Sequence, residues 1–244
     1  MGLNYTQTGE FQPALEASTR AHTIGEAIGD PRLQTFAAWV TGTIYSAMGE
    51  WDAGIAACQR GLERSPDPLN SAIVKGWLGF AYLEKGDPSQ AILLLEESVR
   101  ETGKFGFKKF QSWFTTFLAE AHRINRELEQ ARDLAQEGLR IATDAKFPVG
   151  VGWARQVLGR TALANGALSE AETQLGGALS TFTAIHSRYE LARTHLDLAQ
   201  LARAQERKDA VASHIRRALD LFAALKVPKH IERAKQLAKA FGVM

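Results

Sequence analysis

The sequence predicts an all-α fold, a right-handed superhelical solenoid of stacked helical hairpins. Three observations predict it. Small residues recur in triplets, a helix-breaking or polar residue follows the first member of each triplet at a fixed distance, and turn-forming segments lie between the repeats. In each triplet the second and third residues follow the first by 12 and 19 positions. The triplets are Gly42, Gly54, Gly61; Gly79, Ala91, Ser98; Ala119, Ala131, Gly138; and Gly159, Ala171, Ala178. Similar sets start at Gly2 (Ala14, Ala21) and Ala199 (Val211, Ala218). A period of 40 residues, with one step of 37, is typical of helical solenoids.

Small residues at this spacing have a structural reason. Twelve residues lead from one helix, across a tight turn, into its partner, so a missing side chain there lets the two helix axes approach closely. The third small residue lies two turns further along the second helix, on the same face. We expect it to receive the first helix of the next repeat.

Breakers and polar residues support the predicted turns. The residue seven positions after each triplet begins is one of Gly9, Gly49, Gly86, Arg126, Gly166 and Glu206. Glycine is favoured just past a helix because it adopts the left-handed conformation without strain. The segments expected to separate repeats are Gly29-Asp30-Pro31, Ser65-Pro66-Asp67-Pro68, Thr102-Gly103, Phe147-Pro148 and Val227-Pro228.

These residues resemble the tetratricopeptide repeat (TPR) family. The second repeat carries the pattern most fully, in Gly42, Tyr45, Gly49, Trp51, Gly54, Gly61, Leu62 and Pro66. The fourth repeat departs from it, with Ala119, His122 and Arg126 where glycine, tyrosine and glycine are usual. The longer period is similar to TPR regions of bacterial transcription activators and of ATPase- or cyclase-linked signalling proteins. The resemblance implies a protein-interaction scaffold.

The expected organisation is a single solenoid over residues 1–244. It comprises about six hairpins, the first truncated, and a terminal capping helix at about 229–241. Because Gly2 already holds a triplet position, with Tyr5 and Gly9 in register, we expect the chain to be a fragment of a larger protein; a short native first helix is the alternative.

Composition narrows the class of protein. Hydrophobic residues make up 45% of the chain, and no apolar run reaches the roughly 18 residues of a membrane span. The N-terminus lacks the basic and apolar regions of a secretory signal. One cysteine excludes an intramolecular disulfide and favours a cytoplasmic location.

Charge is distributed unevenly along the chain. Residues 1–122 carry 10 Lys and Arg against 14 Asp and Glu, and residues 123–244 carry 19 against 13. The basic excess lies mostly in the last repeat and the terminal helix. A solvated end of the solenoid is the favoured interpretation, and a footprint for an acidic partner or nucleic acid is the alternative.

No residue pattern predicts catalysis, a metal site or a cofactor. The six histidines form no metal-binding spacing. His122 is expected to be a satisfied core residue and Cys58 a buried structural thiol. The chain is therefore predicted not to be an enzyme.

The resemblance places the first helix of each hairpin on the concave face. Rows of residues at fixed offsets from the triplets then predict a partner-binding groove of aromatic and charged side chains. The predicted groove residues are Phe36, Trp39, Phe80, Trp113, Glu120, Arg123, Trp153, Gln156, Arg160, Arg193 and Arg203. Aromatic residues and arginines carry much of the binding energy at protein interfaces. Whether Trp113 and Trp153 face the groove or the core between repeats is left open.

The sequence thus favours a non-catalytic scaffold that binds a peptide or helix of a partner protein, with arginines pairing acidic side chains. A regulatory or self-association module of a larger signalling protein, including a homodimer, is the second hypothesis. Nucleic-acid binding through the basic C-terminal end is the weakest of the three.

Overall fold

The computed structural model describes residues 9–243, and this part of the chain is an all-α solenoid of twelve helices without strands. The helices are α2 (Phe11–Ala27), α3 (Pro31–Met48), α4 (Trp51–Glu63), α5 (Pro68–Lys85), α6 (Pro88–Lys104), α7 (Lys108–Ile124), α8 (Leu128–Asp144), α9 (Pro148–Ala164), α10 (Leu168–Ala184), α11 (Arg188–Ala204), α12 (Lys208–Leu225) and α13 (Pro228–Ala240). The expected role of Gly2 and Tyr5 in a first hairpin falls outside the described residues.

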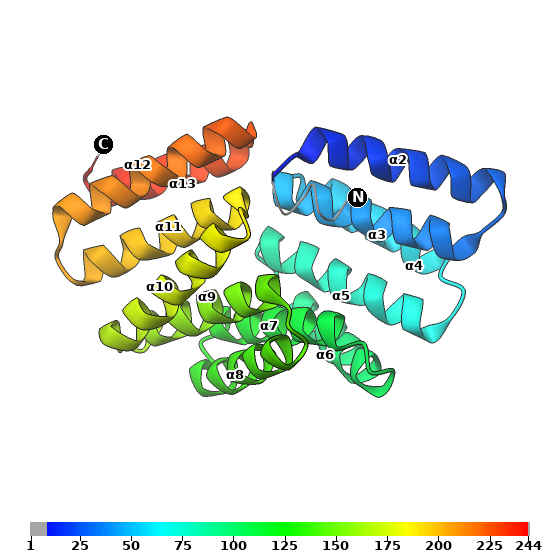
Figure 1. Ribbon diagram of the computed structural model, residues 1–244, viewed down its shortest axis with the longest axis horizontal. Helices are drawn as coiled ribbons and strands as arrows, with labels where there is room; N and C mark the ends of the chain where they lie inside the picture. Colours follow the sequence, from blue (N-terminus) through cyan, green and yellow to red (C-terminus); the bar gives the residue numbers. More distant parts are fainter. Residues whose placement is uncertain (1–8, 244) are drawn as a thin grey trace.

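Ten of these helices form five antiparallel hairpins, α3–α4, α5–α6, α7–α8, α9–α10 and α11–α12. Helix α2 precedes the first of these hairpins. Helix α13 follows the last one and corresponds to the capping helix predicted at about 229–241. Successive hairpins rotate, so that the helices descend from α2 to α8 and rise again to α12 and α13 (Figure 1). The odd-numbered helices α3 to α11 lie on the inside of this arc.

Local signals explain where the helices begin and end. Asp30, Asp67 and Asp87 each accept a backbone N–H at a helix N-terminus, and each precedes a proline at the first helical position. Left-handed residues end the first helix of each hairpin at the predicted positions, including Arg126 (φ 69°) and Glu206 (φ 59°) where glycine is absent.

One predicted turn is misplaced. Thr102 and Gly103 lie inside α6, and the left-handed residue is Gly106 (φ 69°). The Thr102 side chain is buried and donates a hydrogen bond to the Ser98 carbonyl one turn earlier, so the helix continues past it.

The small residues bring the paired helices together as expected. A Cβ atom on Gly54 would lie 2.5 Å from the Ser46 Oγ and 2.9 Å from the Gly42 carbonyl oxygen. The third small residue was assigned wrongly, however. Gly61 faces Ala38 of α3, and the Ser98 hydroxyl donates to the Ala72 carbonyl of α5. Residues seven apart share a helix face, so the second and third small residues pack against the same helix of their own hairpin.

Aromatic side chains fill the inside of the arc. Trp39 and Trp77 stack with ring centroids 5.7 Å apart, and Trp77 contacts Trp113 at 5.1 Å. Trp113 in turn lies 5.8 Å from Trp153. One tryptophan from each of α3, α5, α7 and α9 thus forms a continuous aromatic core across four repeats.

Side chains also join the two ends of the arc. The Lys229 ammonium at the start of α13 donates to the Gly49 carbonyl and pairs with Glu50, beside the α3–α4 turn. The His230 Nε2 lies 2.9 Å from the Ala47 carbonyl oxygen. The concave face is consequently enclosed between the early and late repeats.

Candidate functional site: the concave cavity

A large cavity of about 1240 Å³ lies on the concave face. It is bordered by α5, α7, α9 and α11 and by α13 at its far side. Seven lysine and arginine side chains line it against four carboxylates. The cations are Lys85, Arg123, Arg126, Arg160, Arg193, Lys229 and Arg233, and the anions are Glu84, Glu120, Asp197 and Glu232. The cavity therefore carries a positive excess.

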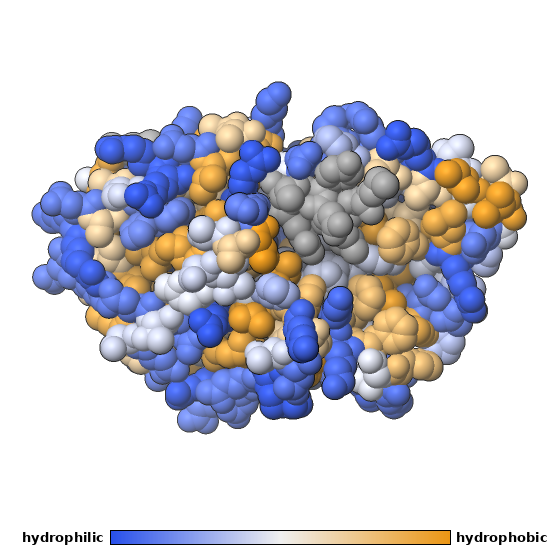
Figure 2. Space-filling view, in the orientation of Figure 1, coloured by the Kyte–Doolittle hydropathy of each residue, from blue (hydrophilic) through white to orange (hydrophobic). Residues whose placement is uncertain are grey.

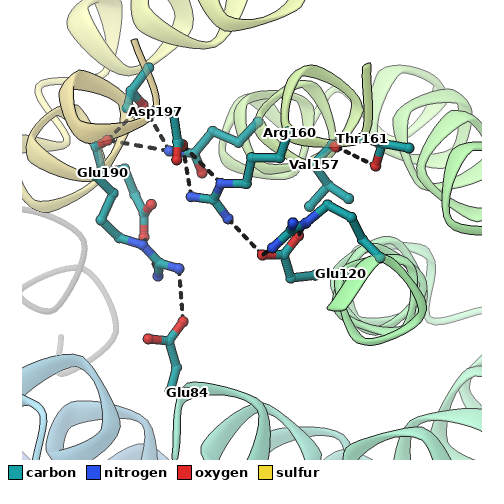
Figure 3. Close-up of polar contacts among 11 residues, drawn as sticks. Glu84, Glu120, Val157, Arg160, Thr161, Glu190 and Asp197 are labelled. Atoms are coloured by element: carbon teal, nitrogen blue, oxygen red, sulfur yellow. Dashed lines mark hydrogen bonds and ion pairs between the residues drawn. The ribbon is translucent and has the colours of Figure 1, made fainter. Parts of the chain in front are cut away.

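A network of buried ion pairs forms one side of this cavity. Arg160 on α9 reaches Asp197 on α11 at 2.9 Å and Glu120 on α7 at 3.2 Å (Figure 3). Arg123 makes a two-pronged contact with the same Glu120, at 2.7 and 2.9 Å. These pairs tie the first helices of three successive repeats together.

A second pair crosses the concave face. The Arg193 guanidinium on α11 contacts Glu84 on α5 at 2.8 Å, between residues 109 positions apart in the chain. Figure 3 shows Glu84 pointing toward this network from the opposite side of the arc. Arg193 also lies 3.9 Å from Glu190 on its own helix. The Arg193 guanidinium thus links the two halves of the inner face.

For the buried carboxylates of this network, burial raises the pKa and neighbouring arginines lower it. Burial alone would raise the pKa of Glu84, but Arg193 and other nearby cations hold it below its ordinary value. Burial likewise opposes ionisation of Glu120, yet Arg160 and Arg123 lower its pKa. At Glu190, burial outweighs Arg193, so the pKa is raised. Glu84 and Glu120 are therefore ionised at neutral pH, whereas the pKa of Glu190 lies above its ordinary value.

Two arginines of the cavity rim have no counterion. Arg126, in the α7–α8 turn, and Arg233, on α13, are exposed, and neither forms an ion pair with any residue from 9 to 243. Lys85 and Lys229 at the same rim are neutralised by Asp52 and Glu50. Arg126 and Arg233 are thus rim cations outside any ion pair of the described residues, although Arg233 also acts on Glu84 through space.

The structure divides the predicted groove residues into four groups. Glu120, Arg123, Arg160 and Arg193 line the large cavity together. Phe36 is 44% exposed and contacts Trp39 edge-on. Arg203 lies outside the large cavity; its guanidinium lies over the Phe241 ring and donates to the Ala240 carbonyl at the C-terminal end.

The remaining predicted residues are buried or, for Trp153, half-buried. Trp39, Phe80 and Trp113 are 3–5% exposed, and only Trp153 of the predicted tryptophans stays partly exposed. Gln156 is also buried, and its amide donates to Thr194 at 2.8 Å. Trp113 and Trp153 belong to the core between repeats, and they also line the small cavity described next.

The small cavity, of about 30 Å³, lies beside this aromatic core. Its walls include Trp77, Phe80, Trp113, Trp153 and Tyr189, and one charged side chain, Glu190. The Glu190 side chain is buried, and hydrogen bonding by the Trp153 indole N–H opposes the rise in its pKa. The indole N–H groups of Trp77 and Trp113 are buried without an acceptor among the described residues.

Three carboxylates of the inner face were missed from the sequence, Glu84 and Asp197 in the large cavity and Glu190 in the small one, although a signal was present. Glu190 lies nine positions before the start of its triplet, and Asp197 lies two positions before it. Glu84 lies five positions after the start of its own triplet. These offsets differ by seven and form one stripe along the first helices. This stripe adjoins the rows used for the prediction, so including it would have found the carboxylates that pair with the arginines.

The other candidate reactive groups have structural roles. His122 is 5% exposed and bonds to Glu127 and Gln130, as expected of a satisfied core histidine. Cys58 is buried, and burial raises the pKa of its thiol to about 12. Among residues 9–243, no three His, Cys, Asp or Glu side chains gather where they could hold a metal ion.

None of the described helices combines the length and apolar character needed to cross a membrane. Hydrophilic side chains cover the end of the arc formed by α11 and α12 (Figure 2). Hydrophobic surface is visible at the opposite end, near the α2–α3 turn, where Ile24 and Ile28 are 54% and 65% exposed.

Repeated helical hairpins with close small-residue contacts define this chain as a TPR-like solenoid, and solved structures share that fold. A Rap protein complexed with Competence and Sporulation Factor has a TM-score of 0.76 at 12% identity, covering 98% of this chain and 70% of that one. Bacillus thuringiensis PlcR in complex with the peptide PapR7 and DNA has a TM-score of 0.68 at 14% identity, covering 82% and 74%.

A third similar structure is the signal transduction ATPase PH0952 from Pyrococcus horikoshii, which has a tetratricopeptide repeat sensor. Its TM-score is 0.61 at 15% identity, covering 86% of this chain but only 34% of that protein. No protein-family model matches the sequence, and no curated protein matches it either.

Proposed function

We propose that this chain is a non-catalytic interaction scaffold that binds an acidic peptide segment or helix of a partner protein in the large concave cavity. The main support is the excess of positive over negative side chains in the cavity lining. Two of these cations, Arg126 and Arg233 at the rim, form no ion pair with the described residues. At about 1240 Å³ the cavity exceeds the roughly 300–1,000 Å³ of small-molecule sites, so it suits a chain segment better than a metabolite.

The buried ion pairs and the rim arginines have different roles in this proposal. Arg160 and Arg193 are already neutralised by carboxylates, so they shape the cavity without attracting a further anion. Arg126 and Arg233 have hydrogen-bond donors available for carboxylates, which arginine binds in a two-pronged geometry. Leu83, Leu163 and Trp51 supply the apolar surface of the same cavity. They replace the buried tryptophans as the proposed anchors.

The similar folds support a segment-binding role. The Rap and PlcR structures are complexes with Competence and Sporulation Factor and with the peptide PapR7, respectively. By analogy, an arc of helical hairpins of this kind has a concave face that can accept a short chain segment.

The test is a selection of binding peptides from a random display library, followed by fluorescence anisotropy with the selected sequences. We expect acidic peptides whose affinity falls about tenfold in the double variant Arg126→Glu, Arg233→Glu, because two favourable charge contacts become repulsive. Lys208→Glu is the matched control, since Lys208 is exposed and lies outside the cavity. Selected peptides without acidic residues, or equal affinity in the double variant and the control, would refute the proposal.

A regulatory module of a larger signalling protein is the second candidate. It is favoured by the likeness to the PH0952 ATPase, of which a region the size of this chain is about a third. Light scattering over a concentration series tests the self-association that such a module would use. A monomer at every concentration would exclude the homodimer.

Nucleic-acid binding by the basic C-terminal end stays the weakest hypothesis. It predicts binding to DNA or RNA that weakens steeply with added salt. No retention on either polymer at low salt would dismiss it.

A further inference from the structure

The turn between α6 and α7 exposes an apolar and cationic sequence. Residues 104–109, Lys-Phe-Gly-Phe-Lys-Lys in order, are all exposed, and Phe105 and Phe107 are 49% and 43% exposed. A Cβ atom on Gly106, between them, would meet nothing within 4 Å, so the tip of the turn is open to solvent. Two phenylalanines exposed together at one turn contribute little to the core and indicate a contact surface.

The repeat architecture does not require a phenylalanine here. The residue directly before the first helix of a hairpin is Asp30 before α3 and Asp67 before α5, and both aspartates cap the helix. Before α9 it is Phe147, which is half-buried. Phe107 provides no side-chain cap to α7, and it stays exposed although its ring stacks on Phe110 with centroids 6.4 Å apart.

Three lysines near these rings have no counterion. Lys108 and Lys109 lie in the first turn of α7, and Lys146 lies in the α8–α9 turn. None of the three forms an ion pair with any residue from 9 to 243. The Lys109 ammonium lies 5.7 Å from the centre of the Phe147 ring, which brings it beside Lys146.

The acidic residues that precede these lysines in the sequence are already paired. Glu101 contacts Lys104 at 2.9 Å and Arg100 at 3.2 Å, and Asp144 contacts Arg140 at 3.0 Å. The surface therefore keeps a positive charge beside its exposed rings. Charge complementarity requires an anionic partner that also accepts apolar side chains.

The residue types and their position favour a lipid bilayer over a nucleic acid or a peptide. The three free cations are lysines, whereas arginine is the usual residue for recognising phosphates in nucleic acids. The two rings stand on either side of an open turn, outside the large cavity that suits a peptide. A flat bilayer can receive such a tip, because apolar rings enter between the lipids while ammonium groups stay among the headgroups.

We propose that this surface, formed by Phe105, Phe107, Lys108, Lys109 and Lys146, binds the face of an anionic lipid bilayer. The two rings enter the boundary between headgroups and acyl chains, and the lysines contact the anionic headgroups. Attachment of this kind lies on the membrane surface and needs no spanning helix. It is separate from the large cavity and does not depend on the acidic partner proposed above.

Co-sedimentation of the full chain with lipid vesicles tests the proposal. We expect binding to phosphatidylcholine vesicles that contain about 30% phosphatidylserine, and binding about tenfold weaker or less to phosphatidylcholine alone. One lysine near an anionic bilayer strengthens binding about fivefold, so Lys108→Glu with Lys109→Glu should weaken it at least about 25-fold. Lys208→Glu with Lys235→Glu is the matched control, since both lysines are exposed on α12 and α13, and it should bind as the wild type does.

A second pair of variants tests the rings. Phe105→Ser with Phe107→Ser should weaken binding to the anionic vesicles at least about tenfold, because no apolar side chain then enters the bilayer. Ile24→Ser with Ile28→Ser is the matched control. It removes two apolar side chains of similar exposure, 54% and 65%, at the α2–α3 turn, and it should leave binding unchanged. Circular dichroism checks that each variant is folded.

The competing interpretations give different results. No sedimentation with anionic vesicles at low salt overturns the proposal. Equal binding by the phenylalanine variant and the wild type would reduce the contact to charge attraction alone, and it overturns the proposal as well. Fluorescence anisotropy with labelled oligothymidylate and with labelled polyglutamate supplies the third arm. If either polymer binds through the same phenylalanines while the vesicles do not bind, the surface belongs to a nucleic acid or an acidic peptide instead.

Discussion

The close contact between α3 and α4 makes a quantitative prediction. In α3–α4 both facing residues are glycine, and a methyl group on Gly54 would lie 2.9 Å from the backbone carbonyl oxygen of Gly42. It would also lie 2.5 Å from the Ser46 Oγ, which is fully buried and donates to that carbonyl. The Gly42 carbonyl belongs to the backbone and cannot rotate away, so Gly54→Ala has to force the two helices apart.

The magnitude follows from two opposing effects. Overpacking of a buried contact costs about 1–3 kcal/mol, and replacing glycine by alanine inside a helix returns up to about 1 kcal/mol. A single alanine is accommodated at the equivalent positions Ala91 and Ala171, which indicates that the helices can separate slightly. We therefore expect Gly54→Ala to lower the free energy of unfolding by about 1–2 kcal/mol.

Gly176→Ala is the matched control. Gly176 also lies in the second helix of a hairpin, but it is exposed and a methyl group there meets nothing within 4 Å. It should gain about 0.5–1 kcal/mol from helix propensity alone. Urea unfolding followed by circular dichroism measures both variants. If Gly54→Ala is as stable as the wild type or more so, close axial approach does not explain the small-residue triplets.

Three further predictions follow from buried groups. Arg193→Ala should cost about 3–5 kcal/mol, because it leaves the buried carboxylates of Glu84 and Glu190 without their cation; urea unfolding would show it, and a loss below 1 kcal/mol would mean that the cross-face ion pair contributes little. Burial, with His214 and Arg217, lowers the pKa of His195 from 6.5 to about 4. The stability that depends on a neutral His195 ring, on the order of 3 kcal/mol, is therefore fully present above pH 6.5 and is lost as the pH falls toward 4. In His195→Gln the melting temperature should depend less on pH between 4 and 6.5, and an unchanged pH dependence would contradict the assignment. Because burial raises the pKa of Cys58 to about 12, its thiol should react with a disulfide reagent at pH 8 only at the rate of unfolding, and rapid reaction in native buffer would show that α4 opens locally.

The repeat itself was readable from the sequence because it depends on local rules. Small residues 12 apart face each other whenever two helices are joined by a tight turn, and left-handed residues follow each first helix even where arginine or glutamate replaces glycine. Asp-Pro pairs mark helix starts because the aspartate side chain caps the helix N-terminus, and because proline lacks an N–H group, which has no helical partner at the first position anyway. The class of fold and the position of nearly every turn therefore came from residues close together in the chain.

The groove was only partly predictable. Glu120, Arg123, Arg160 and Arg193 line one cavity, because residues at equal offsets in successive repeats lie side by side. Helical periodicity could not determine how tightly the arc curves. That curvature decides whether a tryptophan at such a position meets a ligand or another tryptophan, and in this chain Trp39, Trp77 and Trp113 meet each other.

Contacts between distant parts of the chain depended on the tertiary structure alone. Glu84 with Arg193, Lys229 with Glu50 and His230 with Ala47 join segments more than 100 residues apart. No repeat spacing encodes them, since they arise from small rotations accumulated over several hairpins. The sequence by itself determined a solenoid of helical hairpins with a charged inner face. The tertiary structure decided that this face closes around an aromatic core, leaving a cationic cavity on one side and the buried Glu190 on the other, because curvature is a property of the whole array.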